Sequence, residues 1–115
     1  MIKLLETLQE IFDTVSKHLL KQNERSGFSD DSCSYRGPNG LKCAAGVLIP
    51  DKEYTFDIFE GKDWSHLVRN QYVESRFSKE ITELQQIHDC DPVKRWKDEL
   101  IKFAEHYNLQ VNFEV

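Results

Sequence analysis

Long apolar segments are missing from this sequence, and cysteines are few. No run approaches the ~18 apolar residues of a membrane-spanning helix. The opening segment, MIKLLETLQE, carries glutamates where a signal peptide would be purely apolar. These absences predict a protein that neither enters a membrane nor is exported, and that resides in a reducing cytoplasm. There, the three cysteines, Cys33, Cys43 and Cys90, are expected to be thiols or metal ligands rather than a disulfide framework.

Basic residues are in the minority, with 15 Lys and Arg against 20 Asp and Glu, for a net charge of -5. Sequence-independent binding to duplex nucleic acid needs clustered Lys and Arg that displace counterions, so we expect no direct duplex binding. The acidic balance is compatible with a protein partner that carries a basic surface. It is also an ordinary charge for a small soluble domain. A homodimer is left open.

Repeats, low-complexity segments and interdomain linkers are absent as well. A chain of 115 residues corresponds to one domain, residues 1–115, that can bury roughly two-thirds of its unfolded surface. Hydrophobic residues make up 39%, including seven Phe, four Tyr and two Trp. A core can therefore form without metal ions or disulfide bonds.

Helical periodicity is the strongest pattern that is present. Apolar residues recur at steps of three and four, which is typical of amphipathic helices. About four helices are expected, over residues 2–22, 64–71, 78–89 and 92–107. Asp63 and Ser78 are suitable N-caps for the second and third, and Asp91–Pro92 is a suitable start for the fourth. The last helix should pack on the first through Trp96, Leu100 and Phe103 against Leu8, Ile11, Phe12 and Val15.

Residues 33–54, CSYRGPNGLKCAAGVLIPDKEY, concentrate special residues that core-building alone does not require. We call this segment the cassette. Its GPNG sequence at 37–40 is a strong turn signal, so residues 33–36 and 41–44 are expected to form a β-hairpin. Residues 109–115 alternate between apolar and polar, which predicts a half-buried strand that could join the hairpin as a third. The predicted fold class is therefore α+β, mostly helical, with a small antiparallel hairpin. Gly46 is expected to mark a close backbone approach.

The cassette resembles a pattern, C-x-Y-R-G-P-x-G-x-K-C-A-x-G-x-L-I-P-D, found in small uncharacterised proteins of tailed phages and prophages. The similarity extends to LQEIFD at 8–13, to Glu60–Gly61, to the LQxxHD helix end at 84–89 and to Trp96. It covers the chain to about Leu109 and leaves the last strand outside. The resemblance implies an accessory protein that acts in the host-cell cytoplasm, and it carries no biochemical role.

The cysteines and His88 are the candidates for metal binding and catalysis. Cys33, Cys43, His88 and Cys90 have the types and number of ligands that zinc takes, but their spacing is poor, so we expect no cofactor and keep zinc as an alternative. A hydrolase would pair a cysteine with His88 and Asp89. Because neighbouring residues diverge on a helix, Asp89 is expected to be badly placed to orient His88, which favours a satisfied core or capping histidine.

Recognition residues are expected on the rigid turn and at the helix end. They are Tyr35, Arg36, Asn39, Lys42, His88 and Asp89. A two-residue loop would place Tyr35 opposite Lys42. An outward Arg36 could fork onto a carboxylate or phosphate, whereas the alternative is an ion pair with Asp51 or Glu53 that braces the hairpin.

Acidic residues at Asp30–Asp31 and over 51–63 lack the spacing of a calcium loop and are expected to be solvated. The glycines likewise lack the spacing of a phosphate loop. The leading hypothesis is a non-enzymatic, phage-type accessory protein that binds and modulates, or inhibits, a host or phage macromolecule. The alternatives are a binder of a small anionic metabolite such as a nucleotide, and a small zinc-binding domain.

Overall fold

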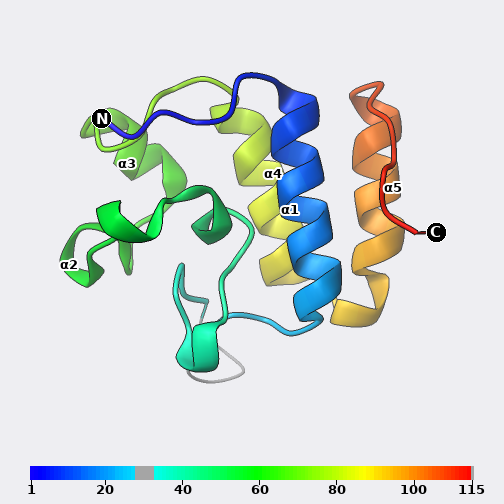
Figure 1. The fold of residues 1–115 in the computed structure, drawn as a ribbon, viewed down its shortest axis with the longest axis horizontal. Coiled ribbons are helices and arrows are strands. Elements are labelled where there is room, and N and C mark those ends of the chain that lie inside the picture. Colours follow the sequence, from blue (N-terminus) through cyan, green and yellow to red (C-terminus); the bar gives the residue numbers. More distant parts are fainter. Residues whose placement is uncertain (28–32, 115) are drawn as a thin grey trace.

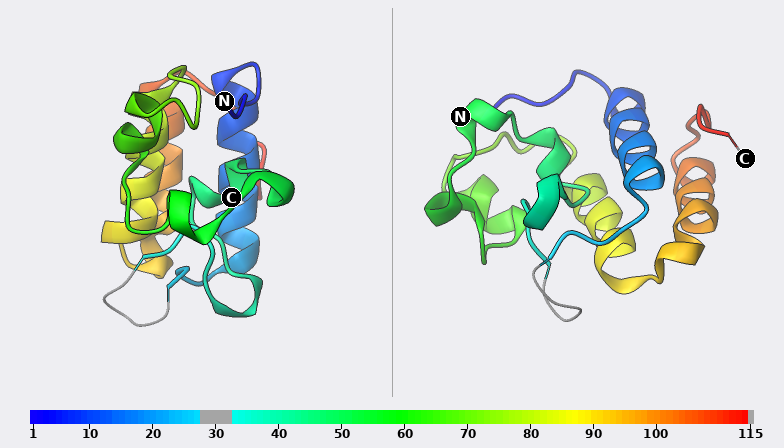
Figure 2. Two further views of the ribbon diagram at one scale, coloured as in Figure 1. Left: turned by 90° about the vertical axis from the view of Figure 1, so that its left-hand side faces the viewer. Right: turned by 60° about the horizontal axis from the view of Figure 1, so that its bottom comes forward.

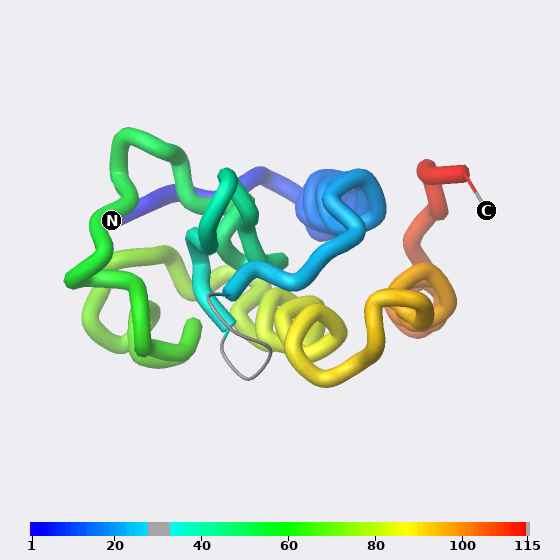
Figure 3. Tube along the Cα trace, turned by 90° about the horizontal axis from the view of Figure 1, so that it is seen from below, coloured from blue at the N-terminus to red at the C-terminus, as the bar shows by residue number. Residues whose placement is uncertain are grey.

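The computed structural model describes residues 1–27 and 33–114. Its α-helices are α1 (Leu8–Gln22), α2 (Phe56–Phe59), α3 (Trp64–Arg69), α4 (Ser78–Cys90) and α5 (Trp96–His106). Its 3-10 turns are η1 (Pro38–Gly40), η2 (Gly46–Leu48), η3 (Asp51–Glu53) and η4 (Val93–Arg95). The long helices α1, α4 and α5 lie alongside one another, and α5 contacts both of the others (Figure 1). Seen from below, the shorter elements form a second lobe beside these helices (Figure 3).

The first helix begins later than its apolar periodicity predicted. Thr7 is the N-cap: its hydroxyl accepts from the Glu10 N–H, and the Glu10 carboxylate accepts from the Thr7 N–H. This capping box fixes the helix start. The preceding residues are extended, and Ile2 forms a single parallel bridge with Val73. Residues 2–7 therefore belong to the connection between the two lobes.

The other helix starts confirm one predicted cap and correct two. Asp63 caps α3 by accepting from the His66 N–H at 2.8 Å, as expected. The N-cap of α4 is Phe77 in the left-handed conformation, so Ser78 is already helical. Asp91 lies at the end of α4 rather than at the start of α5, because its N–H bonds the Ile87 carbonyl. The turn η4 then separates it from α5.

The core lies where the helix faces predicted it. Ile11, Phe12, Trp96 and Leu100 are fully buried, and Phe12 stacks on Phe103 with ring centroids 5.7 Å apart. These contacts fix α1 against α5. In the part of the chain that the structure describes, no helix combines the length and the apolarity needed to traverse a bilayer.

The α+β fold class is wrong, because residues 1–27 and 33–114 contain isolated bridges but no strand. At the predicted hairpin, Arg36 pairs with Lys42, and Gly37 N–H bonds the Leu41 carbonyl. The turn thus includes η1 and is longer than two residues, which shifts the register away from Tyr35 opposite Lys42. Beyond Lys42 the chain coils into η2, so the pairing cannot extend.

The C-terminal tail keeps the predicted alternation of burial but pairs with no strand. After α5 the chain reverses and runs back along the helices (Figure 2). The Gln9 carboxamide donates to the Gln110 carbonyl at 2.9 Å and accepts from the Gln110 N–H at 2.8 Å. One side-chain amide therefore satisfies the N–H and the carbonyl of Gln110, which a neighbouring strand would have paired. Val115 lies outside the described residues.

Gly46 confirms the predicted close approach. A Cβ at this position would collide with the carbonyl oxygen of Tyr35. After the turn the chain forms η2, which packs against α1. The cassette is therefore a tightly coiled unit packed against the long helices.

Candidate functional site

Arg36 is held within the cassette. Its guanidinium donates to the Asp51 carboxylate at 2.6 Å and to the Ile49 carbonyl at 2.5 Å. It also lies over the Tyr54 ring, 4.9 Å from the centroid. The bracing alternative is thus the one formed, with Asp51 as the partner. The Lys42 ammonium, 3.4 Å from the same carboxylate, adds to it.

Glu60 is the centre of this brace. Its carboxylate accepts from the N–H groups of Tyr35 and Arg36, both at 3.0 Å, and from the Tyr54 hydroxyl at 2.6 Å. A regular strand points consecutive N–H groups to opposite sides. Because both groups here turn to one carboxylate, the chain bends at Tyr35 instead of continuing as a strand.

His88 is fully buried at the end of α4, and both of its ring nitrogens have partners. Nδ1 lies 2.7 Å from the Asp89 carboxylate, and Nε2 accepts from the Ser26 N–H at 3.0 Å. Because Nε2 accepts, the hydrogen-bond network places the proton on Nδ1. The expectation that Asp89 cannot orient His88 is wrong, whereas the satisfied core histidine is confirmed.

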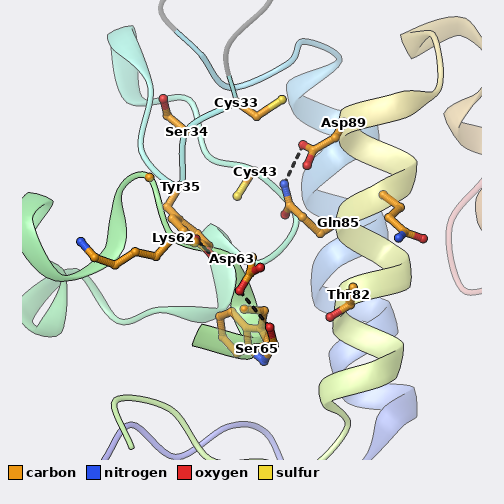
Figure 4. A pocket seen from close by; sticks show the side chains of 13 residues that line it. Cys33, Ser34, Tyr35, Cys43, Lys62, Asp63, Ser65, Thr82, Gln85 and Asp89 are labelled. Atoms are coloured by element: carbon orange, nitrogen blue, oxygen red, sulfur yellow. Dashed lines mark hydrogen bonds between the residues drawn. The ribbon is translucent and has the colours of Figure 1, made fainter. Parts of the chain in front are cut away.

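A cleft of about 410 Å³ opens between the cassette, the start of α3 and one side of α4 (Figure 4). Gln85 connects α4 to the cassette, because its side chain accepts from the Ala45 N–H at 2.9 Å. The same side chain donates to Asp89, also on α4, at 2.7 Å. The walls include Cys33, Tyr35 and Cys43, residues 61–65, and Thr82, Gln85 and Asp89.

The six predicted recognition residues do not form one site. Tyr35 and Asp89 line the cleft, whereas His88 is buried behind it. Arg36 and Lys42 are paired with Asp51. Asn39 is exposed at the tip of the turn with φ 58 and belongs to other surface hollows.

The four predicted zinc ligands are not assembled either. Within residues 1–27 and 33–114, the ligand atoms of Cys33, His88 and Asp89 lie within 4.8 Å of one another. Cys43 is buried in the cleft wall outside this group, where its sulfur accepts from the Gly46 N–H, and Cys90 is exposed. A metal on Nδ1 of His88 would move the proton to Nε2, where it would face the Ser26 N–H. The residues present therefore fit a metal poorly.

The thiols are poorly suited to nucleophilic catalysis. Partial burial and the neighbouring Asp89 raise the pKa of Cys33 to about 11. Burial raises the pKa of Cys43 to about 12. Both remain protonated near neutral pH, and only the thiolate is the strong nucleophile. Since Nε2 of His88 is occupied by a backbone N–H, the imidazole is not placed to take a thiol proton.

The acidic segment 51–63 gathers no metal-type cluster within the described chain. Asp51 holds Arg36, Glu60 holds the cassette backbone, and Asp63 caps α3. The expectation that the acidic residues are solvated is wrong for Glu60, because its carboxylate is hydrogen-bonded to the cassette. Asp30–Asp31 lie outside the described residues.

Sequence reasoning missed most of the cleft. Gln85 and Thr82 are ordinary polar helix residues without a motif. Lys62, Asp63 and Trp64 were interpreted only as a connection and a helix start. A weak signal existed in the spacing of Thr82, Gln85, Gln86 and Asp89, which repeats at three- and four-residue steps and predicts one polar helix face.

Comparison of the chain with family models, curated proteins and solved structures finds no match. A functional interpretation therefore depends on the geometry of the cleft and on the residues that line it.

Proposed function

We propose that this protein is a non-catalytic accessory protein that binds a macromolecular partner through the cleft and modulates it. The observation that carries the proposal is the cleft itself, a recess of about 410 Å³ built from three separate segments, whose mostly apolar lining carries a few polar groups. Recesses of this size with a few placed polar groups are the usual form of a site for a small molecule, and a single side chain of a partner is of similar size. Here Glu60 and Gln85 fix the surrounding backbone, so the polar groups are displayed rigidly.

The state of the side chains supports binding over catalysis. The thiol of Cys33 remains protonated because its pKa is raised to about 11. Both ring nitrogens of His88 take part in structural hydrogen bonds. Among the described residues, neither thiol of the cleft has a free imidazole beside it to take its proton, which is the base that cysteine catalysis needs.

The kind of partner follows from the resemblance to small phage and prophage proteins. That resemblance favours a host or phage macromolecule inside a bacterial cell, with inhibition as one form of modulation. The net charge of -5 favours a protein partner with a basic surface over duplex nucleic acid.

Binding of a small ligand is the second candidate, because the cleft volume lies in the range of ligand pockets. Its lining does not favour an anionic metabolite such as a nucleotide. Asp63 and Asp89 contribute two negative charges against the single positive charge of Lys62. Zinc ranks third, since the hydrogen bonds of His88 compete with it.

A blocking substitution tests the proposal. Thr82 is exposed on the cleft wall, so Thr82→Arg should fill the opening without disturbing the core. Ser75→Arg is the matched control, because it adds the same group at an exposed position outside the cleft. Affinity capture from bacterial lysate with mass spectrometry should recover one partner with the wild type and with Ser75→Arg, but not with Thr82→Arg. Equal recovery with all three would contradict the proposal.

A further inference from the structure

We infer that the cleft accepts an organic cation, an ammonium or guanidinium group, supplied by a basic side chain of a partner or by a free amine. The inference rests on the proposed function, because it assigns ligand chemistry to the same cleft. Its starting observation is that two carboxylates line the recess from different elements. Asp63 stands at the start of α3 and Asp89 near the end of α4 (Figure 4).

Arg69 lies near enough to Asp63 to contribute to lowering its pKa, and it donates to the Ser65 hydroxyl at 3.4 Å. Two other neighbouring cations are engaged elsewhere. The Lys62 ammonium donates to the Asp57 carbonyl at 2.7 Å, and its side chain extends away from Asp63 and Asp89 (Figure 4). The Arg25 guanidinium donates to the carbonyls of His88 and Asp91 at 3.2 and 2.6 Å, which places it on the end of α4. Neither group forms an ion pair with Asp63 or Asp89.

Both carboxylates are fixed in position and retain accepting capacity. Asp63 accepts from the His66 N–H and the Ser65 hydroxyl, and these bonds hold its pKa below the usual range, so it is ionised at neutral pH. Asp89 is oriented by Gln85 and His88. Among the described residues these bonds all reach the Oδ1 atom. A carboxylate can accept about four hydrogen bonds, so each can take more donors.

The remaining walls suit a cation with an apolar stem. The Tyr35 hydroxyl donates to the Lys62 carbonyl at 2.8 Å. The buried Tyr35 side chain therefore contributes its aromatic ring to the cleft wall. Trp64 adds a second aromatic side chain, and Thr82 offers a neutral hydroxyl oxygen. Aromatic faces attract ammonium and guanidinium groups, and the long stems of Lys and Arg pack on apolar surface. A ligand anion would instead meet two like charges.

The test is an NMR titration of the ¹⁵N-labelled protein with four small probes. These are the N-acetyl amides of arginine and lysine, with those of glutamine and glutamate as neutral and anionic controls. The cationic probes should shift amide signals of residues 61–65 and 82–89 and bind at least tenfold more tightly than the glutamine probe. Equal binding of the neutral probe, or shifts confined to other segments, would overturn the inference.

Isosteric variants separate charge from structure. Asp63→Asn and Asp89→Asn keep the accepting oxygen, and Asn remains a good N-cap, so both should fold. Together they should weaken binding of the arginine probe about tenfold, equivalent to ~1.4 kcal/mol. Asp98→Asn, which removes one exposed charge on α5, should leave the Kd unchanged. An unchanged Kd in the double variant, with its spectrum showing an intact fold, would overturn the inference.

Two further comparisons identify the source of the cation and separate cation binding in the cleft from partner binding. Putrescine binding more tightly than the arginine probe would identify a free amine, and the reverse a basic side chain; either supports the inference. A captured partner that the double variant retains refutes the inference and leaves the proposed function standing. Cationic probes that bind the cleft while no partner is captured support the inference and contradict the proposed function.

Discussion

Removing the Glu60 carboxylate is expected to destabilise the cassette. Glu60→Ala deletes the acceptor for the N–H groups of Tyr35 and Arg36 and for the Tyr54 hydroxyl. An unsatisfied polar group in a part-buried position costs ~1–3 kcal/mol. The Tyr54 hydroxyl can turn to water, so the two N–H groups dominate. We expect a loss of about 2–4 kcal/mol in the free energy of unfolding.

Urea denaturation followed by tryptophan fluorescence would measure this loss. Glu53→Ala is the matched control, because Glu53 is exposed and lies outside the brace; it should change stability by less than ~0.5 kcal/mol. Glu60→Gln should be intermediate, since one amide oxygen remains while its NH₂ group faces a backbone donor. A loss below ~1 kcal/mol for Glu60→Ala would refute the view that this carboxylate replaces a strand partner.

Three further predictions concern the core, pH and metal. Trp96→Ala should cost roughly 3–5 kcal/mol, because it opens a cavity between α4 and α5; a loss under ~1 kcal/mol in urea melts would mean that the last helix is not part of the core. Burial lowers the pKa of His18 below its ordinary 6.5, so the unfolded chain takes up the proton first as the pH falls. The stability contributed by neutral His18 is therefore complete above about pH 6.5 and declines below it, and His18→Gln should show a smaller loss between pH 7.5 and 5.5 than the wild type in paired urea melts. Dialysis against EDTA should leave the Tm unchanged; stoichiometric zinc that is lost together with the fold would contradict this.

The helical part of the fold could be predicted because burial on a helix leaves a period in the sequence. Ile81, Leu84 and Ile87 recur at three-residue steps and are all buried. The start of α1 was misplaced, although the Thr7–Glu10 capping box is readable in the sequence. The apolar residues before it, such as Leu4, are buried too, but as an extended segment. Periodicity alone does not separate these two ways of burying a side chain.

The missing sheet could not be predicted, because its peptide groups are satisfied by side chains distant in sequence. Gln9 pairs with Gln110 across 101 positions, and Glu60 reaches back 24 and 25 residues to the cassette. The alternating tail and the cassette turn have the same local sequence pattern whether their peptide groups pair with a strand or with a side chain. The cleft was partly hidden for the same reason, since its walls come from three segments.

The cassette shows why a dense motif need not be the contact surface. Arg36 has the chemistry of a recognition residue, but its donors reach Asp51 and Ile49, and its side chain is only 19% exposed. Replacing it would first disturb the brace, so a loss of binding in Arg36→Ala would not by itself locate a site. Thr82, which belongs to no motif, is exposed on the cleft wall and can be changed with little effect on packing, and Asp63 can be changed to Asn, which still caps α3. A recognition surface in this protein is therefore better tested on the ordinary polar residues that the cassette positions than on the cassette itself.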